Sequence, residues 1–152
     1  MGWHSPDGYR ISDDRAQLDV RAIHASLTRS YWASGIPLAI VERSVGNSLC
    51  FGLYAPDGAQ VGFARVITDR ATFAYLCDVY VLEEHRGRGL SKFLMRCIGE
   101  HPDLLGLRRF MLATADAHGL YAQFGFATPA RPERLMEKLD REVYARLARS
   151  LG

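Results

Sequence analysis

A strand, a glycine turn and a helix follow one another in residues 78–98, and this run limits the possible folds more than any other stretch. Residues 78–82 (DVYVL) are rich in the β-branched and aromatic residues of strands. The turn RGRG occupies residues 86–89, and the apolar residues after it fall on one helical face: Leu90, Phe93, Leu94, Cys97 and Ile98. A helix that begins in such a turn directs unpaired N–H groups and its positive dipole end into the turn. The run therefore predicts an α/β unit with a phosphate-binding turn.

The turn has other interpretations. It could be an ordinary strand-to-helix connection with arginines facing solvent. A triphosphate-binding P-loop is excluded, because no G-x-x-x-x-G-K-[ST] run exists. A dinucleotide fingerprint is also excluded, since Lys92 stands where its third glycine would be.

Composition limits the class of protein. A chain of 152 residues with 48% hydrophobic residues is long enough for one domain with a real core. The net charge of +2 gives no reason to expect a nucleic-acid partner, and no apolar run is long enough to cross a membrane. Cys50, Cys77 and Cys97 fit buried, reduced thiols in a cytoplasmic protein, and their spacing suggests no metal site.

The rest of the chain reads as short alternating elements. Residues 1–8 are expected to be loose, because Gly2, Pro6 and Gly8 discourage regular structure. The expected strands are residues 9–12, 48–54, 60–68, 73–82 and 109–114, and the expected helices are residues 18–31, 37–44, 91–100 and 117–124. The strands at 73–82 and 109–114 should be parallel neighbours, because a helix connects them.

The C-terminal segment gives conflicting signals. Leu135, Leu139, Val143 and Leu147 recur every four residues, which by itself predicts one long helix. The order of the preceding elements instead calls for a strand at residues 134–139 that completes the sheet. We follow the topology and expect this strand, then a short helix from Asp140.

Two motifs resemble the GNAT superfamily of N-acetyltransferases. Residues 86–91 (RGRGLS) are similar to its Arg/Gln-x-x-Gly-x-Gly/Ala signature, with Ser91 in the last position. Residues 120–126 (LYAQFGF) are similar to its L-Y-x-x-x-G-F stretch. The resemblance implies the GNAT fold over the single domain 1–152. That is an α/β (α+β) fold with one mixed, mostly antiparallel sheet, flanked by helices and splayed at the cofactor site.

The resemblance also implies the cofactor and its contacts. Acetyl-CoA would be the co-substrate, with no metal. The residues expected to hold it are Val79, Tyr80, Val81, Arg86, Gly87, Arg88, Gly89, Leu90, Ser91 and Thr114. Thr114 stands where the family often has asparagine, so that contact would come from a hydroxyl.

Tyr121 matches the tyrosine that acts as general acid in many relatives, since a phenol stays protonated at pH 7 and can donate to a leaving thiolate. A purely packing role is the alternative. Asp78 is our candidate base, and His24 and His118 are rivals. Asp116 is expected to cap the short helix at residue 117.

The acceptor is less defined by the sequence. Tyr31, Trp32 and His24 are candidates to bind it, although the two aromatic residues could equally cap the core. We expect a small-molecule primary amine and leave a homodimer open. The alternatives are a noncatalytic acyl-CoA-binding domain, an enzyme for longer acyl groups, and one for protein amines.

Overall fold

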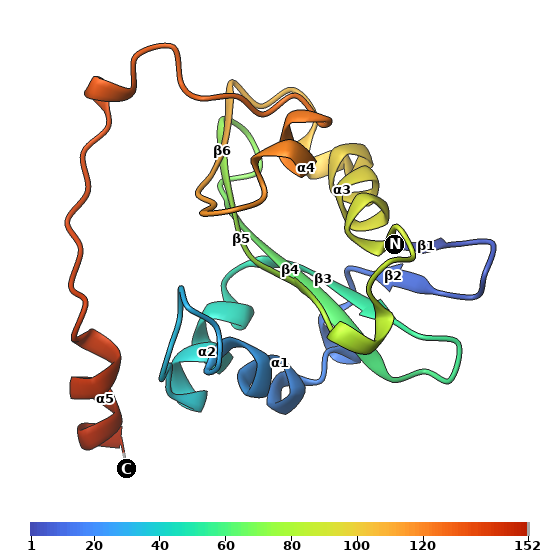
Figure 1. Cartoon of the computed structure of the whole chain (residues 1–152), viewed down its shortest axis with the longest axis horizontal. Helices are drawn as coiled ribbons and strands as arrows, with labels where there is room; N and C mark the ends of the chain where they lie inside the picture. The colour runs from blue at the N-terminus through green and yellow to red at the C-terminus, as the bar shows by residue number, and fades with distance from the viewer. Residues whose placement is uncertain (152) are drawn as a thin grey trace.

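The computed structural model describes residues 1–151, and its centre is one six-stranded sheet with strand order β1-β2-β3-β4-β5-β6 (Figure 1). Neighbouring strands pair antiparallel up to β5, and β5 pairs with β6 in parallel. The strands are β1 (Gly2–His4), β2 (Arg10–Ser12), β3 (Leu49–Tyr54), β4 (Gln60–Thr68), β5 (Phe73–Val81) and β6 (Arg109–Leu112). The predicted mixed, mostly antiparallel sheet is confirmed.

Helices cover both faces of this sheet. One face carries α1 (Val20–Leu27) and α2 (Leu38–Gly46), and the other carries α3 (Leu90–Glu100) and α4 (His118–Ala122) (Figure 1). α5 (Val143–Leu151) follows a long extended stretch, and Tyr144 near its start packs against the hydrophobic cluster of α1 and α2. Every residue of the central strand β3 is buried, because it has a helical layer on each side. This is why LCFGLY reads as a continuous apolar run.

β5 is distorted near its end. The register with β4 shifts between Phe63 and Arg65, where two residues of β5, Asp78 and Val79, face one residue of β4. Such a β-bulge bends and twists the strand that carries it. Asp78 adopts φ +55°, a left-handed conformation that aspartate tolerates better than most residues. Val79 and Val81 pack on the α3 side, while Asp78 and Tyr80 face α1 and α2.

The prediction that residues 1–8 are loose is wrong. Gly2–His4 forms β1 and pairs with β2, so residues 9–12 do not form the edge of the sheet. The Trp3 ring packs against the rings of Phe51 and His101, with centroids 6.0 and 6.3 Å away. Burial of this aromatic side chain outweighs the weak local propensity of the glycine-rich segment.

The predicted strand at residues 134–139 is also wrong for this chain, and so is a single long helix. Pro132–Arg134 forms a 3-10 turn, and residues 127–142 are all exposed. The only regular helix in this part of the described chain is α5, which begins at Val143, close to the expected helix from Asp140. A strand needs a paired neighbour, and within residues 1–151 this segment has none.

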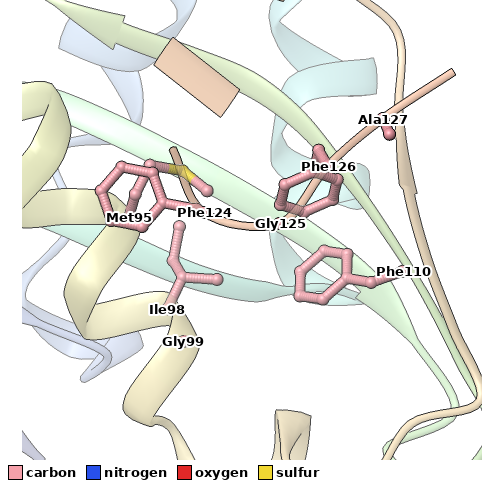
Figure 2. A pocket seen from close by; sticks show the side chains of 8 residues that line it. All are labelled: Met95, Ile98, Gly99, Phe110, Phe124, Gly125, Phe126 and Ala127. Carbon is pink, nitrogen blue, oxygen red and sulfur yellow. The ribbon is translucent and has the colours of Figure 1, made fainter. Parts of the chain in front are cut away.

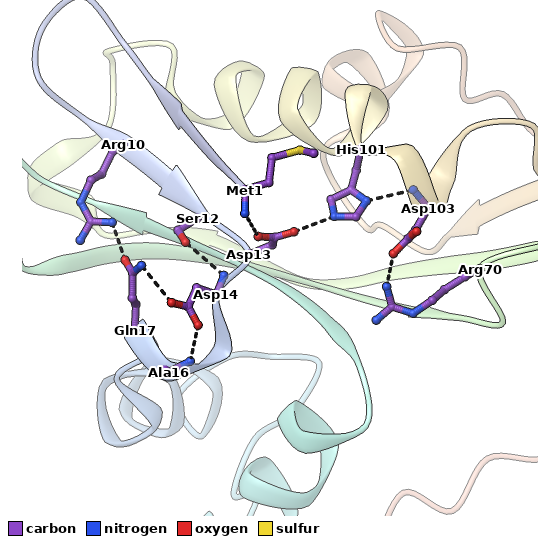
Figure 3. Close-up of polar contacts among 10 residues, drawn as sticks. All are labelled: Met1, Arg10, Ser12, Asp13, Asp14, Ala16, Gln17, Arg70, His101 and Asp103. Carbon is purple, nitrogen blue, oxygen red and sulfur yellow. Dashed lines mark hydrogen bonds and ion pairs between the residues drawn. The ribbon is translucent and has the colours of Figure 1, made fainter.

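A polar cluster fastens the β1–β2 hairpin to the end of α3 (Figure 3). The Nδ1 atom of His101 accepts the backbone N–H of Asp103 at 3.1 Å, so the proton lies on Nε2. Nε2 then donates to Oδ2 of Asp13 at 2.7 Å, and the amino group of Met1 donates to Oδ1 at 2.7 Å. Burial alone would raise the pKa of Asp13, but these two hydrogen bonds outweigh burial and hold the pKa below its ordinary value.

Asp13→Asn should therefore lower the free energy of unfolding at pH 7 by about 1.5–3 kcal/mol, the usual net contribution of hydrogen bonds to charged groups. The pKa of the folded carboxyl is depressed, so its contribution is complete above the unfolded pKa of about 3.9 and disappears as pH falls through the folded pKa. Urea denaturation at pH 7 and pH 3.5 measures this difference. Asp57→Asn is the control, because Asp57 caps the turn at Ala59 with a bond that asparagine can also accept. Equal stability of the two variants at pH 7 would contradict the assignment.

Candidate active site

The glycine turn leads directly into α3, as the sequence predicts. Gly87 and Gly89 have φ +79° and +73°, which glycine adopts without strain, and Gly89 is the N-cap residue of α3. A Cβ atom on either glycine would meet nothing within 4 Å, so the space in front of the turn is open. Within residues 1–151 no side chain caps the first N–H groups of α3, so these groups are free to bind an anion.

Arg86 is already engaged in holding the turn together. Its backbone N–H donates to the Glu83 carbonyl at 3.2 Å, and its Nε donates to the Val81 carbonyl at 3.1 Å. The second bond fixes the turn to the end of β5. Both arginines are exposed, but Arg88 makes no hydrogen bond within residues 1–151. The two arginines that look equivalent in the sequence therefore differ in the folded protein.

β5 and β6 separate in front of this turn. Their pairing begins at Phe73 with Arg109 and ends at Leu76 with Leu112, whereas β5 continues to Val81. Residues 78–81 are therefore paired with β4 alone, and their other edge faces the gap. Open α/β sheets bind ligands in such crevices at the carboxyl ends of diverging strands.

The Asp78 carboxylate is buried and joins two elements. Its Oδ2 atom accepts Nε of Arg65 at 2.8 Å, and its Oδ1 atom accepts the indole N–H of Trp32 at 2.9 Å. Arg65 also donates from Nη1 to the Ser48 hydroxyl at 3.1 Å. The pair thus connects the bulge in β5 with β4 and with the loop between α1 and α2.

Tyr31 and Trp32 form a bridge over the end of the parting strands. Their rings meet edge to face, with centroids 5.1 Å apart. The Tyr31 hydroxyl accepts the backbone N–H of Ala115 at 3.4 Å, in the loop after β6. Tyr31 is 66% and Trp32 43% exposed, so neither ring is buried in the core.

Tyr121 lies at the first turns of α4, 9% exposed, with its ring edge to face with Phe126. Within residues 1–151 its hydroxyl has no hydrogen-bond partner. Burial raises its pKa, and Tyr31 and Asp116 raise it further. The raised pKa keeps the Tyr121 phenol protonated at neutral pH.

The remaining residues predicted for the site are His24, Thr114, Asp116 and His118, and they differ in their contacts. The Nε2 atom of His24 hydrogen-bonds the Ile36 carbonyl at 2.9 Å, which connects α1 to the loop before α2. The predicted cap by Asp116 is absent: the Thr114 hydroxyl oxygen accepts the Ala117 N–H at 3.0 Å instead. The Thr114 hydroxyl proton remains available to a ligand. His118 is exposed at the start of α4.

Arg65 is the site residue that our sequence reasoning missed. It falls on the apolar face of β4 with Phe63 and Ile67, where a charged group needs a partner. The neighbouring antiparallel strand contains Asp78, so the sequence did offer a carboxylate partner for Arg65. The bulge that aligns the two side chains was not visible in the sequence.

Other features lie away from this site. Within the described residues, no group of three His, Cys, Asp or Glu side chains could hold a metal ion, and no helix is long and apolar enough to cross a membrane.

An open apolar hollow of about 460 Å³ lies between α3 and the chain after α4 (Figure 2). Met95, Ile98, Phe110, Phe124 and Phe126 supply its walls, and none of them belongs to the glycine turn.

Comparison with known proteins identifies the family. The model of the acetyltransferase (GNAT) domain matches residues 47–128, which include β3 through α4. The chain belongs to the GNAT acetyltransferase family. The chain is also 36% identical to an inferred acetyltransferase of Gibberella zeae over 81% of this chain and 80% of that protein.

Solved GNAT structures share the fold. A crystal structure from Xanthomonas campestris pv. campestris, assigned to the GNAT family, is 56% identical with a TM-score of 0.87, over 90% of this chain and 96% of that one. Glucosamine-6-phosphate N-acetyltransferase from Arabidopsis thaliana has a TM-score of 0.61 at 14% identity, over 86% of this chain and 97% of that one. At that identity the likeness concerns the fold alone.

Gly89→Ala should destabilise the GNAT domain by about 1 kcal/mol, because a Cβ atom strains the left-handed backbone even where space is open. Gly99→Ala is the matched control. Gly99 lies in α3 with an ordinary helical backbone and equally open space, so alanine there should add about 0.5–1 kcal/mol. Urea denaturation of both variants measures the difference, and a Gly89→Ala protein as stable as Gly99→Ala would refute the backbone argument.

Proposed function

We propose that this protein is an acetyl-CoA-dependent N-acetyltransferase that acts on the primary amine of a small molecule. One observation carries the proposal: the unpaired edge of residues 78–81 runs toward a glycine turn whose N–H groups are free. An extended ligand with an anionic end fits that combination. The family membership makes acetyl-CoA the natural candidate.

The residues of the chain suit the two parts of this ligand. The free N–H groups of Gly87 through Ser91, together with the positive end of α3, would hold the pyrophosphate. Arg88 would add charge, while Arg86 keeps the turn in place through its bond to Val81. Backbone groups of Val79, Tyr80 and Val81 would pair with the amide-containing arm, as a strand does at an open edge.

Acetyl-CoA supplies a thioester as the acyl donor. In the proposed reaction the amine nitrogen forms a C–N bond to the acyl carbon, and the bond from that carbon to sulfur breaks. One proton leaves the amine for a base, and one proton is given to the departing thiolate. Tyr121 would supply the latter, because its raised pKa keeps the phenol protonated and its hydroxyl is uncommitted.

Asp78 remains our candidate base. Each carboxylate oxygen already accepts one hydrogen bond, from Trp32 or from Arg65, but each has a second lone pair. These contacts hold the carboxylate in one orientation on β5. A water molecule could carry the proton from the amine to Asp78.

The high pKa values of the three cysteine thiols support direct transfer of the acetyl group to the amine, without an acyl-cysteine intermediate. Burial raises the pKa of Cys50, Cys77 and Cys97 to about 12 each. Only a thiolate is an effective nucleophile, so none of the three is activated.

A small acceptor is supported by the aromatic bridge. Tyr31 contacts the loop after β6 and Trp32 contacts β5, so the acceptor side of the gap is partly closed. A folded protein substrate would need a more open face.

Isothermal titration with acetyl-CoA, free CoA and ATP tests the ligand. We expect both CoA species to bind and ATP not to, because only CoA has an arm that reaches residues 79–81. Release of CoA thiol in a screen of small amines then identifies the acceptor. Failure of both CoA species to bind would refute the proposal.

Tyr121→Phe tests the acid. Turnover should fall about 10²-fold, the typical worth of general acid catalysis, while the Kd for acetyl-CoA stays within about twofold. Steady-state CoA release and titration measure the two quantities. Tyr54→Phe is the control. Tyr54 is the last residue of β3, and its buried hydroxyl has no hydrogen-bond partner within residues 1–151, so removal of this hydroxyl should leave turnover unchanged. A fully active Tyr121→Phe enzyme would show that the acid assignment is wrong, and binding with no turnover on any amine would favour the noncatalytic alternative.

A further inference from the structure

The first hairpin of the chain contacts the residue that precedes the glycine turn. Tyr9 lies directly before β2 and is only 5% exposed. Its hydroxyl and the Nδ1 atom of His85 share a hydrogen bond of 2.8 Å, and the two rings meet edge to face with centroids 5.7 Å apart. His85 is followed at once by Arg86, so a residue 76 positions earlier in the sequence holds the chain where the turn begins.

Tyr9 has a fixed position from which to hold His85. Its backbone N–H donates to the Ser5 hydroxyl at 3.0 Å, and its carbonyl accepts the Ser5 N–H at 2.8 Å. Its ring belongs to the hydrophobic core that also contains Leu90, the first residue of α3. The phenol is therefore held by both its backbone and its packing.

The glycine turn needs support on its N-terminal side. Its two glycines allow many backbone conformations, and this freedom must be given up when an anion binds. On its C-terminal side the turn leads into α3, which fixes the backbone. On its N-terminal side, two side-chain hydrogen bonds within residues 1–151 hold the chain. One joins Arg86 to the Val81 carbonyl, and the other joins Tyr9 to His85.

We propose that Tyr9 is a positioning residue for the ligand of the glycine turn. Through Nδ1 of His85 it holds the 3-10 turn Glu83–His85, and the orientation of this turn determines where the free N–H groups after Arg86 point. A turn that already has its binding conformation loses less conformational freedom when phosphates bind, so its affinity for them is higher. The inference rests on the proposed function, because it takes the ligand to be the pyrophosphate of CoA.

Tyr9→Phe tests the hydrogen bond, because phenylalanine keeps the ring and its edge-to-face contact and removes only the hydroxyl. Isothermal titration should show a Kd for CoA that is about fivefold higher, the equivalent of one ordinary hydrogen bond. The Kd for pantetheine, which has the arm but no pyrophosphate, should not change, whereas a general loss of packing would weaken both ligands. Tyr54→Phe is the matched control: the buried Tyr54 hydroxyl has no partner within residues 1–151, so neither Kd should change.

Variants of His85 test whether Tyr9 acts through this residue, and they remain informative if Tyr9→Phe misfolds. His85→Asn keeps a hydrogen-bonding atom near the position of Nδ1, so its Kd for CoA should stay close to the wild-type value. His85→Leu removes that atom and should raise the Kd as Tyr9→Phe does. The double variant Tyr9→Phe/His85→Leu should be no weaker than His85→Leu, because both changes break the same bond. Additive losses, or equal affinities of His85→Asn and His85→Leu, would overturn the proposal.

Amide hydrogen exchange on the ligand-free proteins gives a measurement that does not depend on CoA. The amides of His85 and Arg86 are each hydrogen-bonded to the backbone carbonyl three residues earlier. Both amides should exchange faster in Tyr9→Phe than in the wild type. Unchanged exchange, or an unchanged Kd for CoA, would overturn the positioning role and leave the acetyltransferase proposal intact. A wild type that binds no CoA would refute both proposals.

Discussion

The contact between Arg65 and Asp78 is the interaction on which the site depends. Asp78 lies in a β-bulge with a left-handed backbone, and the Arg65 guanidinium on the neighbouring strand holds its carboxylate at 2.8 Å. A buried carboxylate without that partner would be costly. The ion pair thus stabilises the distortion, and the distortion directs the last residues of β5 away from β6.

The parting of β5 and β6 opens a gap at the end of the sheet. Pairing stops at Leu76 and Leu112, and the freed edge of β5 continues to the turn that opens α3. Trp32, held by the same Asp78 carboxylate, and Tyr31, which contacts the loop after β6, close the far side. One carboxylate therefore influences both the shape of the strand and the position of the aromatic bridge.

The outer edge of β6 presents the opposite situation. β6 is the last strand of the sheet, and within residues 1–151 its outer backbone groups are unpaired. Edge strands of stable proteins are usually covered or blunted.

The sequence alone determined the parts that depend on local patterns. Strand and helix periodicity gave β3 to β6 and α1 to α4 within a few residues, and the glycines of the turn defined where α3 begins, because φ above zero favours glycine. Only the tertiary structure decided the rest. The Trp3 ring packs against Phe51, which stabilises β1 as a strand. Arg65 pairs with Asp78 across a bulge. Residues 134–139 have no neighbouring strand within residues 1–151. In each case a contact between distant residues, or its absence, outweighed local propensity.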